Sequence, residues 1–276
     1  MRSGMNPNRH ANVNGYAPIV LAAITHLPEL NGYHEHRLDV IKCCLETMRD
    51  NTEVDHQILV WDNGSTAALT HWLKRSYQPD YLITGPNIGK WNARASITRM
   101  LPEDTILGVT DDDMYFYPGW LEAHLEVFNK YPRVGTVSGC PVRTQFRFHN
   151  TSTIEWGKRF AQIEAGRFIS EDLERDFCTS IGRDYEKHKQ GTANEMDIRL
   201  RFAGLEVYAT GHHCQFVGRA GILAEHTVFS NEAMPSERPF EQSLDINGLL
   251  RLTTVERYTQ HIGNILDERL EEQWRK

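Results

Sequence analysis

The stretch Thr105-Ile106-Leu107-Gly108-Val109-Thr110-Asp111-Asp112-Asp113 decides the fold, because an apolar run ends there in three consecutive acids. Short continuous apolar runs are typical of strands buried on both faces of a parallel sheet. Three carboxylates in a row repel one another and lose hydration, so they need a cation or strong hydrogen-bond donors. A helix cap would use only one aspartate, and the next helix is expected later, near Pro118. The sequence therefore predicts a site for Mg²⁺ or Mn²⁺, which leaves coordination positions open for phosphate oxygens.

On both sides of this stretch, strand-like and helix-like segments alternate along the chain. We expect strands at 19–24, 57–61, 81–84, 105–110 and 134–138, and helices at 33–50, 66–76, 89–101 and 118–131. Such alternation predicts an α/β, Rossmann-like fold with a mixed, mostly parallel sheet and helices on both faces. Ligands of these sheets bind beyond the carboxyl ends of the strands. The turn Asp62-Asn63-Gly64-Ser65 and the Asp triplet should therefore lie on the same rim.

The second half of the sequence has a weaker rhythm. Residues 143–190 are polar, basic at first and without clean periodicity, which indicates an insertion. A helix is expected over 194–203, ending at Gly204, with strands at 206–210 and 214–217. Residues 249–274 carry an apolar stripe that predicts a long C-terminal helix, which would pack on the domain or on a second subunit in a homo-oligomer.

The composition is that of an ordinary globular protein, with 40% hydrophobic and 24% charged residues. A net charge of -7 argues against general binding to polyanions such as nucleic acids. The five cysteines are odd in number and lack CxxC spacing, so neither a disulfide framework nor a zinc knuckle is expected. Residues 1–17 are predicted to be a flexible leader without a secretory apolar run, and no stretch approaches membrane-spanning length. A cytoplasmic location is therefore expected.

The segment from Leu107 to Leu121, LGVTDDDMYFYPGWL, resembles the DxD segment of GT-A-fold glycosyltransferases of the family 2 type. The shared features are the apolar strand, the DxD, a short spacer, a proline and an aromatic-Leu pair. The resemblance implies that Asp111 faces the nucleotide and also helps to hold the metal. It implies that Asp113 ligates the metal that bridges the diphosphate, with Asp112 as the variable middle residue.

Two further segments resemble the same family in the correct order. Residues 60–66, VWDNGST, are similar to the family's DDGS turn, in which the first acid bonds the nucleotide base. This role falls on Asp62, and Asn63 stands in place of the second acid. Residues 86–94, PNIGKWNAR, are similar to the NxGxxxAxN segment that lines the nucleotide pocket. By that resemblance the nucleotide-binding residues there are Asn87, Gly89, Lys90 and Arg94.

The acceptor side resembles the family more loosely. Residues 194–204, NEMDIRLRFAG, are similar to a family helix whose first acid is the general base that deprotonates the acceptor hydroxyl. Glu195 and Asp197 are both candidates for this base, and Glu195 is preferred. Metal-using members often add a later histidine ligand, for which His212, His213 and His226 are candidates. We favour His226, because a short apolar run should return it to the sheet rim.

Together these resemblances imply a divalent-metal-dependent glycosyltransferase that moves a sugar from a nucleoside-diphosphate sugar, UDP- or GDP-linked, to an unknown acceptor hydroxyl. An inverting reaction is expected if the predicted base acts. The implied division is a leader (1–17), a nucleotide-sugar-binding half (18–140), an acceptor-binding and catalytic half (141–235) and a C-terminal helical extension (236–276).

Two alternatives stay open at this point. A non-catalytic protein that binds nucleotide sugars would explain the altered acidic pair around Glu195. A sugar-phosphate nucleotidyltransferase shares the broad architecture, but it normally has a Gly-rich basic loop after the first strand. Here that strand leads into Thr25-His26-Leu27-Pro28 instead.

Overall fold

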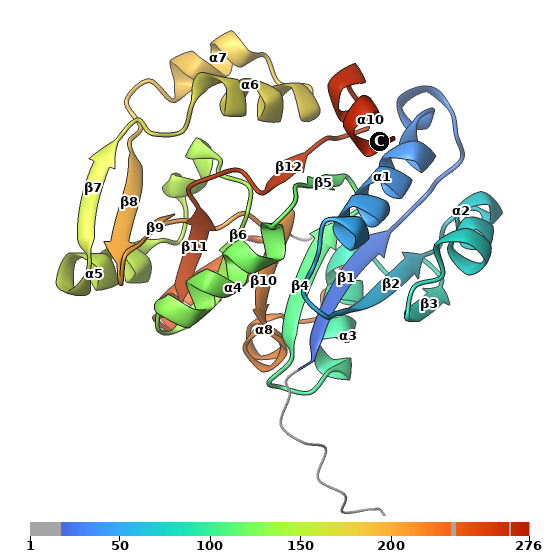
Figure 1. Ribbon diagram of the computed structural model, residues 1–276, viewed down its shortest axis with the longest axis horizontal. Coiled ribbons are helices and arrows are strands. Elements are labelled where there is room, and N and C mark those ends of the chain that lie inside the picture. The colour runs from blue at the N-terminus through green and yellow to red at the C-terminus, as the bar shows by residue number, and fades with distance from the viewer. Residues whose placement is uncertain (1–17, 233–235, 265, 276) are drawn as a thin grey trace, which may run out of the picture.

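A large mixed sheet forms the centre of the molecule (Figure 1). The computed structural model describes residues 18–232, 236–264 and 266–275, so the predicted leader at 1–17 lies outside the described residues. Ten strands pair in the order β3-β2-β1-β4-β10-β6-β11-β9-β8-β7. They are β1 (Ile19–Thr25), β2 (Gln57–Asn63), β3 (Tyr81–Gly85), β4 (Ile106–Asp111), β6 (Val134–Ser138), β7 (Gln162–Gly166), β8 (Asp197–Phe202), β9 (Leu205–Tyr208), β10 (Gln215–Arg219) and β11 (Leu250–Thr254).

The strand directions confirm a mixed, mostly parallel sheet. The pairs β3-β2, β2-β1, β1-β4 and β6-β11 are parallel. Strand β10 is antiparallel to both β4 and β6, and β9, β8 and β7 alternate in direction. Seven strands thus run one way, and β10, β9 and β7 run the other. A small second sheet pairs β5 (Met114–Phe116) with β12 (Thr259–His261).

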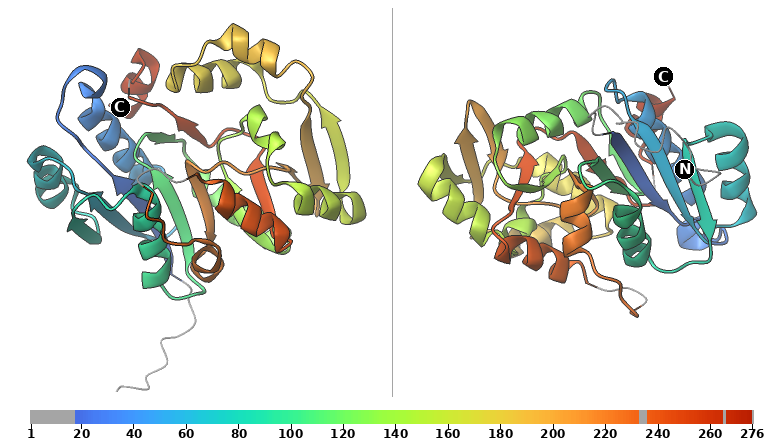
Figure 2. Two further views of the ribbon diagram at one scale, coloured as in Figure 1. Left: turned by 180° about the vertical axis from the view of Figure 1, so that it is seen from behind. Right: turned by 90° about the horizontal axis from the view of Figure 1, so that it is seen from below.

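Helices cover both faces of the sheet (Figures 1 and 2). One apolar core joins the sheet to α1, α2 and α4, and a second joins it to α3, α8 and α9. None of the described helices is long and apolar enough to cross a membrane. The helical segments are η1 (Gly32–His34), α1 (Arg37–Asp50), α2 (Ala67–Trp72), η2 (Leu73–Tyr77), α3 (Lys90–Met100), α4 (Trp120–Lys130), η3 (Arg143–Arg147), α5 (Thr151–Phe160), α6 (Glu171–Ser180), α7 (Tyr185–Gly191), α8 (Ala220–His226), α9 (Arg238–Ile246) and α10 (Glu268–Trp274).

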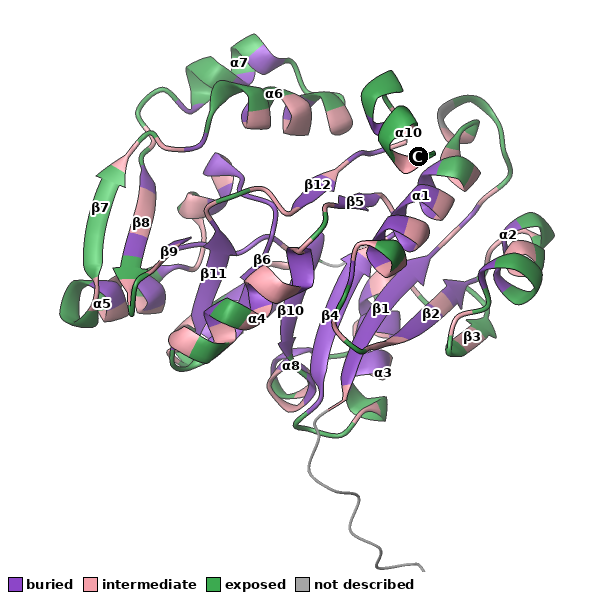
Figure 3. Ribbon diagram, in the orientation of Figure 1, coloured by how far each residue is buried: buried purple, intermediate pink, exposed green. Residues whose placement is uncertain are grey.

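Strand β1 shows why its sequence is apolar without interruption. Ile19, Leu21 and Ala23 face the core beneath α1, and the residues between them face the core beneath α3. All seven residues of β1 are buried, as are most residues of β2 and β4 beside it (Figure 3). A strand covered on both faces needs apolar side chains at every position, not at every second one.

Two helices predicted from sequence are wrong. Residues 194–203 do not form a helix: β8 and β9 make a hairpin whose turn residues Ala203 and Gly204 have φ values of 49° and 78°. Two left-handed residues in succession match a two-residue hairpin turn, so Gly204 closes a hairpin and does not end a helix. Residues 249–274 form β11, β12 and α10 in place of one helix.

The C-terminal segment is also more central than expected. Strand β11 lies inside the main sheet, between β6 and β9. Helix α10 packs near α1, where Leu270 is buried and Trp274 Nε1 donates to Glu46 Oε2 at 2.7 Å. The apolar stripe read across 249–274 is therefore used within the chain, and the helix proposed to join two subunits does not exist as such.

Candidate active site

Parallel pairing brings the predicted polar clusters to one rim. In the register, Thr25 lies opposite Asp62 of β2, and Ile24 lies opposite Asp111 of β4. The two acids therefore flank the end of β1. The loop after β1 fills the space between them, because the His26 N–H donates to Asp112 Oδ2 at 2.8 Å and the His26 ring contacts the Asn63 carbonyl oxygen. The sequence reasoning did not single out His26.

Asp111 is held by two cations from α3. Lys90 Nζ lies 3.0 Å from Asp111 Oδ2, and Arg94 Nη2 lies 3.6 Å from Asp111 Oδ1. Glu237 pairs with the same two cations, at 3.0 Å from Lys90 and 2.9 Å from Arg94. Burial raises the pKa of Asp111, but Lys90 and Arg94 outweigh it and bring the pKa below its ordinary value. Lys90 and Arg94 thus lie beside the first acid of the triplet, and their nucleotide-binding role stays a prediction; Glu237 was not foreseen.

The next two acids turn toward α1. Arg37, the first residue of that helix, pairs with Asp112, lies 3.4 Å from Asp113 Oδ2 and donates to Asn264 Oδ1 at 2.8 Å. Burial, opposed by Arg37 and reinforced by Asp113, raises the pKa of Asp112 to about 6. Asp112 is only 5% exposed and is enclosed by its partners. The middle acid therefore anchors the loop, which leaves the outer two for a ligand.

The nucleotide-side residues form one hydrogen-bonded unit. Asp62 accepts from the Ser65 N–H at 3.1 Å and from the Thr70 hydroxyl at 2.7 Å, so it shapes the turn before α2. Asn63 Nδ2 donates to Asn87 Oδ1 at 2.9 Å, and Asn63 Oδ1 accepts from the Ile88 N–H at 3.0 Å. The loops after β2 and β3 are therefore locked together beside the Asp triplet.

Gly89 and Gly64 allow this close approach. Gly89 precedes α3 with φ 82°, and its N–H donates to Asn87 Oδ1 at 2.8 Å. Gly64 has φ 79°, and a Cβ on it would lie 2.7 Å from the backbone nitrogen of Asn87. Both positions need glycine for backbone reasons.

The structure does not bring His226 to the acids. Strand β10 starts beside Thr110 at the rim and runs antiparallel to β4. Helix α8 follows β10 and therefore lies at the opposite ends of the strands, away from the rim (Figure 1). There His226 Nδ1 contacts the Ser243 hydroxyl at 2.8 Å. The expected return to the rim fails because the apolar run before His226 is helical and leads away from it.

His261 takes the position expected of a ligand histidine. Its Nε2 lies 3.6 Å from Asp113 Oδ2, and its Nδ1 lies 2.8 Å from Ser180 Oγ. The Ser180 hydroxyl donates to the Phe177 carbonyl, so it accepts from His261 Nδ1–H. In the neutral ring, Nε2 then presents a lone pair to a carboxylate, an arrangement that needs a cation or a proton between them. The sequence placed His261 in the middle of a helix and gave no signal for it.

The donor set fits a metal that is shared with a substrate. Asp111 Oδ1 and Asp113 Oδ1 are buried and have no hydrogen-bond partner among the described residues. Within the same residues, no three His, Cys, Asp or Glu side chains could hold a metal ion by themselves. Mg²⁺ and similar cations are commonly held by one or two carboxylates together with substrate phosphates and water. Carboxylate and imidazole ligands beside the nucleotide loops suit that arrangement.

Asp197 does not have the surroundings of a general base. It is fully buried in β8, where Arg143 Nε donates to Oδ1 at 2.8 Å and Arg143 Nη2 to Oδ2 at 3.1 Å. The N–H groups of Phe168 and Ile169 also donate to Oδ2. Every lone pair that could accept a proton from a substrate is engaged or enclosed, so Asp197 is a structural anchor.

Glu195 lies in the loop before β8 and keeps one oxygen free. Its Oε1 is paired with Arg147 of η3, whereas Oε2 has no hydrogen-bond partner in the described part of the chain. Arg147 is also bonded to the Gly191 carbonyl. The preferred candidate base is therefore held in place by an arginine, and its second oxygen is buried without a hydrogen-bond partner among the described residues.

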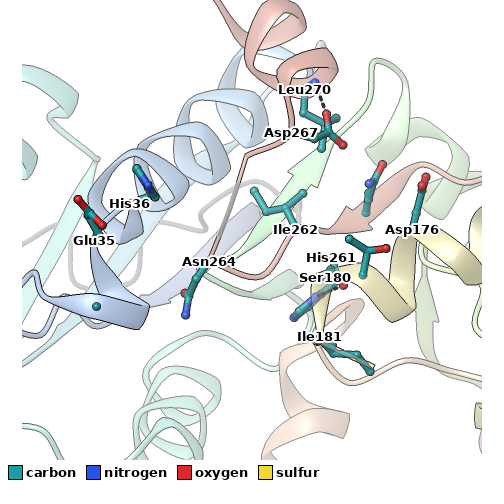
Figure 4. Close-up of a pocket in the computed structure, with 14 residues that line it drawn as sticks. Glu35, His36, Asp176, Ser180, Ile181, His261, Ile262, Asn264, Asp267 and Leu270 are labelled. Carbon is teal, nitrogen blue, oxygen red and sulfur yellow. Dashed lines mark hydrogen bonds between the residues drawn. The ribbon is translucent and has the colours of Figure 1, made fainter. Parts of the chain in front are cut away.

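Two cavities meet at His261. The first, about 510 Å³, lies between η1, the end of α6, β12 and α10, and its wall includes Asp176, Ser180, His261 and Asn264 (Figure 4). The second, about 470 Å³, continues past His261 and Ile181 to His212 and His213. Burial lowers the pKa of His212, so its ring is neutral. Of the three candidate metal ligands, His261 thus borders both cavities.

Known structures share this architecture. The structure of GalNAc-T7 with UDP, GalNAc and Mn²⁺ matches 90% of this chain and 43% of that chain, with a TM-score of 0.54 and 12% identity. S. aureus TarS (residues 1–349) matches 89% of this chain and 60% of that chain, with a TM-score of 0.47 and 10% identity. Mannosyltransferase PcManGT from Pyrobaculum calidifontis, in complex with GDP-Man and Mn²⁺, matches 50% of this chain and 41% of that chain, with a TM-score of 0.37 and 20% identity.

The likeness to GalNAc-T7 shows that the fold is the GT-A fold of glycosyltransferases. The chain spans less than two thirds of the length of each of these proteins. No curated protein sequence matches it significantly. The sequence model named Glycosyl transferase family 2 matches residues 33–190, more than half of the 276-residue chain. The chain therefore belongs to glycosyl transferase family 2.

Proposed function

We propose that this glycosyltransferase is metal-dependent and moves a sugar from a nucleoside-diphosphate sugar to an acceptor hydroxyl. One observation carries the proposal. On the rim shared with the nucleotide loops, Asp111 Oδ1 and Asp113 Oδ1 are buried and have no hydrogen-bond partner among the described residues. Arg94 Nη2 lies 3.6 Å from Asp111 Oδ1, and His261 Nε2 lies 3.6 Å from Asp113 Oδ2. The cations nearby, Arg37, Lys90 and Arg94, neutralise part of this charge and leave a site for one more.

Asp113 and His261 would hold the divalent cation, with Asp111 beside them. Mn²⁺ or Mg²⁺ at this point would supply positive charge for the diphosphate leaving group. Ser180 fixes the His261 ring through Nδ1, as second ligand shells commonly do. Arg37 holds the Asp triplet in position by contacting Asp112 and Asp113 together.

The donor would lie across the loops of Asp62, Asn63 and Asn87. Lys90 is 41% exposed and uses two partners, Asp111 and Glu237, so a third N–H can reach a phosphate oxygen. The UDP and Mn²⁺ present in the GalNAc-T7 structure support a UDP-sugar, and the GT-A fold is equally compatible with a GDP-sugar. We assign donor binding to residues 18–140.

Glu195 would be the general base on the acceptor side. We assign acceptor binding to residues 141–235. The free Oε2 accepts the proton of the acceptor hydroxyl while the oxygen attacks the anomeric carbon and the diphosphate leaves. Attack opposite the leaving group inverts the configuration at that carbon. Arg147 fixes the orientation of the Glu195 side chain through their ion pair.

The test is release of nucleoside diphosphate from UDP- and GDP-sugars in Mn²⁺ by the wild type, Asp113→Ala and Asp104→Asn. Asp104 is an exposed acid in the loop before β4 and serves as the matched control. We expect Asp113→Ala to lose roughly 100-fold or more in turnover and the control to be unchanged. Undiminished turnover in Asp113→Ala would overturn the metal assignment. Donor binding by the wild type without turnover would make the protein a non-catalytic binding protein of the same fold.

A further inference from the structure

The cavity beyond His261 is lined on its far side by arginines. Its wall includes Arg147 from η3, Arg183 after α6 and Arg238 from α9, as well as His212, His213 and His261. None of the described residues that line it is an aspartate or glutamate. In a protein with a net charge of -7, a cavity with this lining is an unusual local excess of positive charge.

Two of the three arginines form ion pairs with glutamates, and within the described residues the third does not. Arg147 pairs with Glu195 and Arg238 with Glu241, whereas Arg183 is exposed and has no ion-pair partner among the described residues. A smaller cavity of about 240 Å³ shares Arg147 and Arg183 and adds Lys187 and one acid, Asp184, whose Oδ1 accepts from the Lys187 N–H at 2.8 Å. Arg183, the arginine without an ion-pair partner among the described residues, therefore lines both the cavity beyond His261 and this smaller cavity.

A buried network of ion pairs and hydrogen bonds lies beneath the wall that carries these arginines. Within this network, Arg143 is buried between Asp197 of β8 and Glu174 of α6 and donates to the Ile169 carbonyl at 2.7 Å. Glu174 Oε1 also lies 3.1 Å from His188 of α7. This buried network ties η3, α6, α7 and β8 together, so it supports the backbone that carries Arg147 and Arg183.

These cations are separate from those of the donor site. Lys90 and Arg94 lie on α3 and are held by Asp111 and Glu237. Arg147 and Arg183 belong to the segment between β6 and β8, on the other side of His212 and His261. An anion that binds them would lie beyond the transferred sugar, where the acceptor must be.

We propose that the acceptor is anionic, carrying a phosphate, sulfate or carboxylate group that Arg183 binds together with Arg147. The inference rests on the proposed function, because it takes the cavity beyond His261 to be the acceptor side of the same site. The planar guanidinium can bind such oxyanions through two parallel hydrogen bonds. The positive charge of this lining would attract an anion locally, although the net charge of the protein is -7.

The experiment is a calorimetric titration of the full chain saturated with UDP and Mn²⁺. The probes are glucose, glucose 6-phosphate and glucuronic acid, which share a hexose ring and differ in charge. We expect the two anionic probes to bind at least about tenfold more tightly than glucose. We also expect them to compete with each other for a single site. Arg183→Ala should remove most of this difference, whereas Arg159→Ala, an exposed arginine of α5, should retain it.

The outcomes separate this inference from the proposed function. Equal binding of all three probes, or an unchanged preference in Arg183→Ala with a native circular dichroism spectrum, would overturn the anionic acceptor and leave the donor site standing. An anionic probe that competes with UDP would assign the arginines to the donor diphosphate and overturn it too. Failure of UDP and Mn²⁺ to bind the wild type would overturn the proposed function and this inference with it. If Arg183→Ala does not fold, Arg183→Lys, which keeps the charge and loses the planar fork, should weaken the anionic probes.

Discussion

Asp111, Asp112 and Asp113 are consecutive in the sequence, but each has different partners and therefore a different role in the proposed site. Asp111 faces the cations of α3, Asp112 is enclosed by Arg37 and His26, and Asp113 faces His261. The pKa of Asp111 is lowered and that of Asp112 is raised, although one peptide bond separates them. The sequence identified the cluster because three acids after an apolar strand need compensation. It could not identify Arg37, Glu237 or His261, because the partners come from distant segments without a motif.

Gly64 provides a prediction at the same scale. Gly64→Ala places a Cβ 2.7 Å from the backbone nitrogen of Asn87 and also strains a left-handed residue. We expect the free energy of unfolding to fall by roughly 3 kcal/mol in urea titrations and UDP affinity to weaken. Gly182→Ala, at φ 65° with open space around the added Cβ, carries only the backbone strain and should lose about 1 kcal/mol. Equal losses in the two variants would contradict the close contact between the loops.

At the scale of elements, strand β8 explains the largest error of the sequence reading. The run Asp197-Ile198-Arg199-Leu200-Arg201-Phe202 alternates apolar and charged residues, which is the period of a strand. The resemblance of residues 194–204 to a family helix predicts a helix there instead. The two-residue turn Ala203-Gly204 was read as a helix end for the same reason. Only the pairing of β8 with β7 and β9 settles the choice.

Glu195, in the loop before β8, and Asp197, the first residue of β8, are expected to differ in role: the first as a base, the second as a structural anchor. Glu195→Gln should lower the rate of sugar transfer about 100-fold to 10,000-fold and change the free energy of unfolding by less than about 1 kcal/mol, since its ion pair is partly exposed. Asp197→Asn should cost roughly 3 kcal/mol in unfolding, because Arg143 stays buried without its full partner. Both quantities are measured on the same preparations, by transfer assay and by urea titration. A stable but inactive Asp197→Asn together with an active Glu195→Gln would reverse the assignment.

At the scale of the whole molecule, the N-terminal half follows from sequence more closely than the rest. Strands β1 to β4 and helices α1, α3 and α4 lie near their predicted positions, because local periodicity and order along the chain agree there. The second half depends on pairings between distant segments. Strand β11 lies beside β6, and β12 pairs with β5, which brings His261 to Asp113. Such contacts leave little trace in local patterns, so neither the approach of His261 to Asp113 nor the arginine-lined cavity could be predicted from the sequence.

The pairing of β12 with β5 brings His261 to Asp113, so a His261 variant is the most direct test of the proposed metal site. Mn²⁺ binding in the presence of UDP, measured by electron paramagnetic resonance, should weaken about tenfold or more in His261→Ala. His226→Ala, which removes the histidine that the sequence favoured, should bind Mn²⁺ like the wild type because His226 contacts Ser243 at the opposite edge of the sheet. Unchanged Mn²⁺ affinity in His261→Ala, or a loss in His226→Ala alone, would contradict the account.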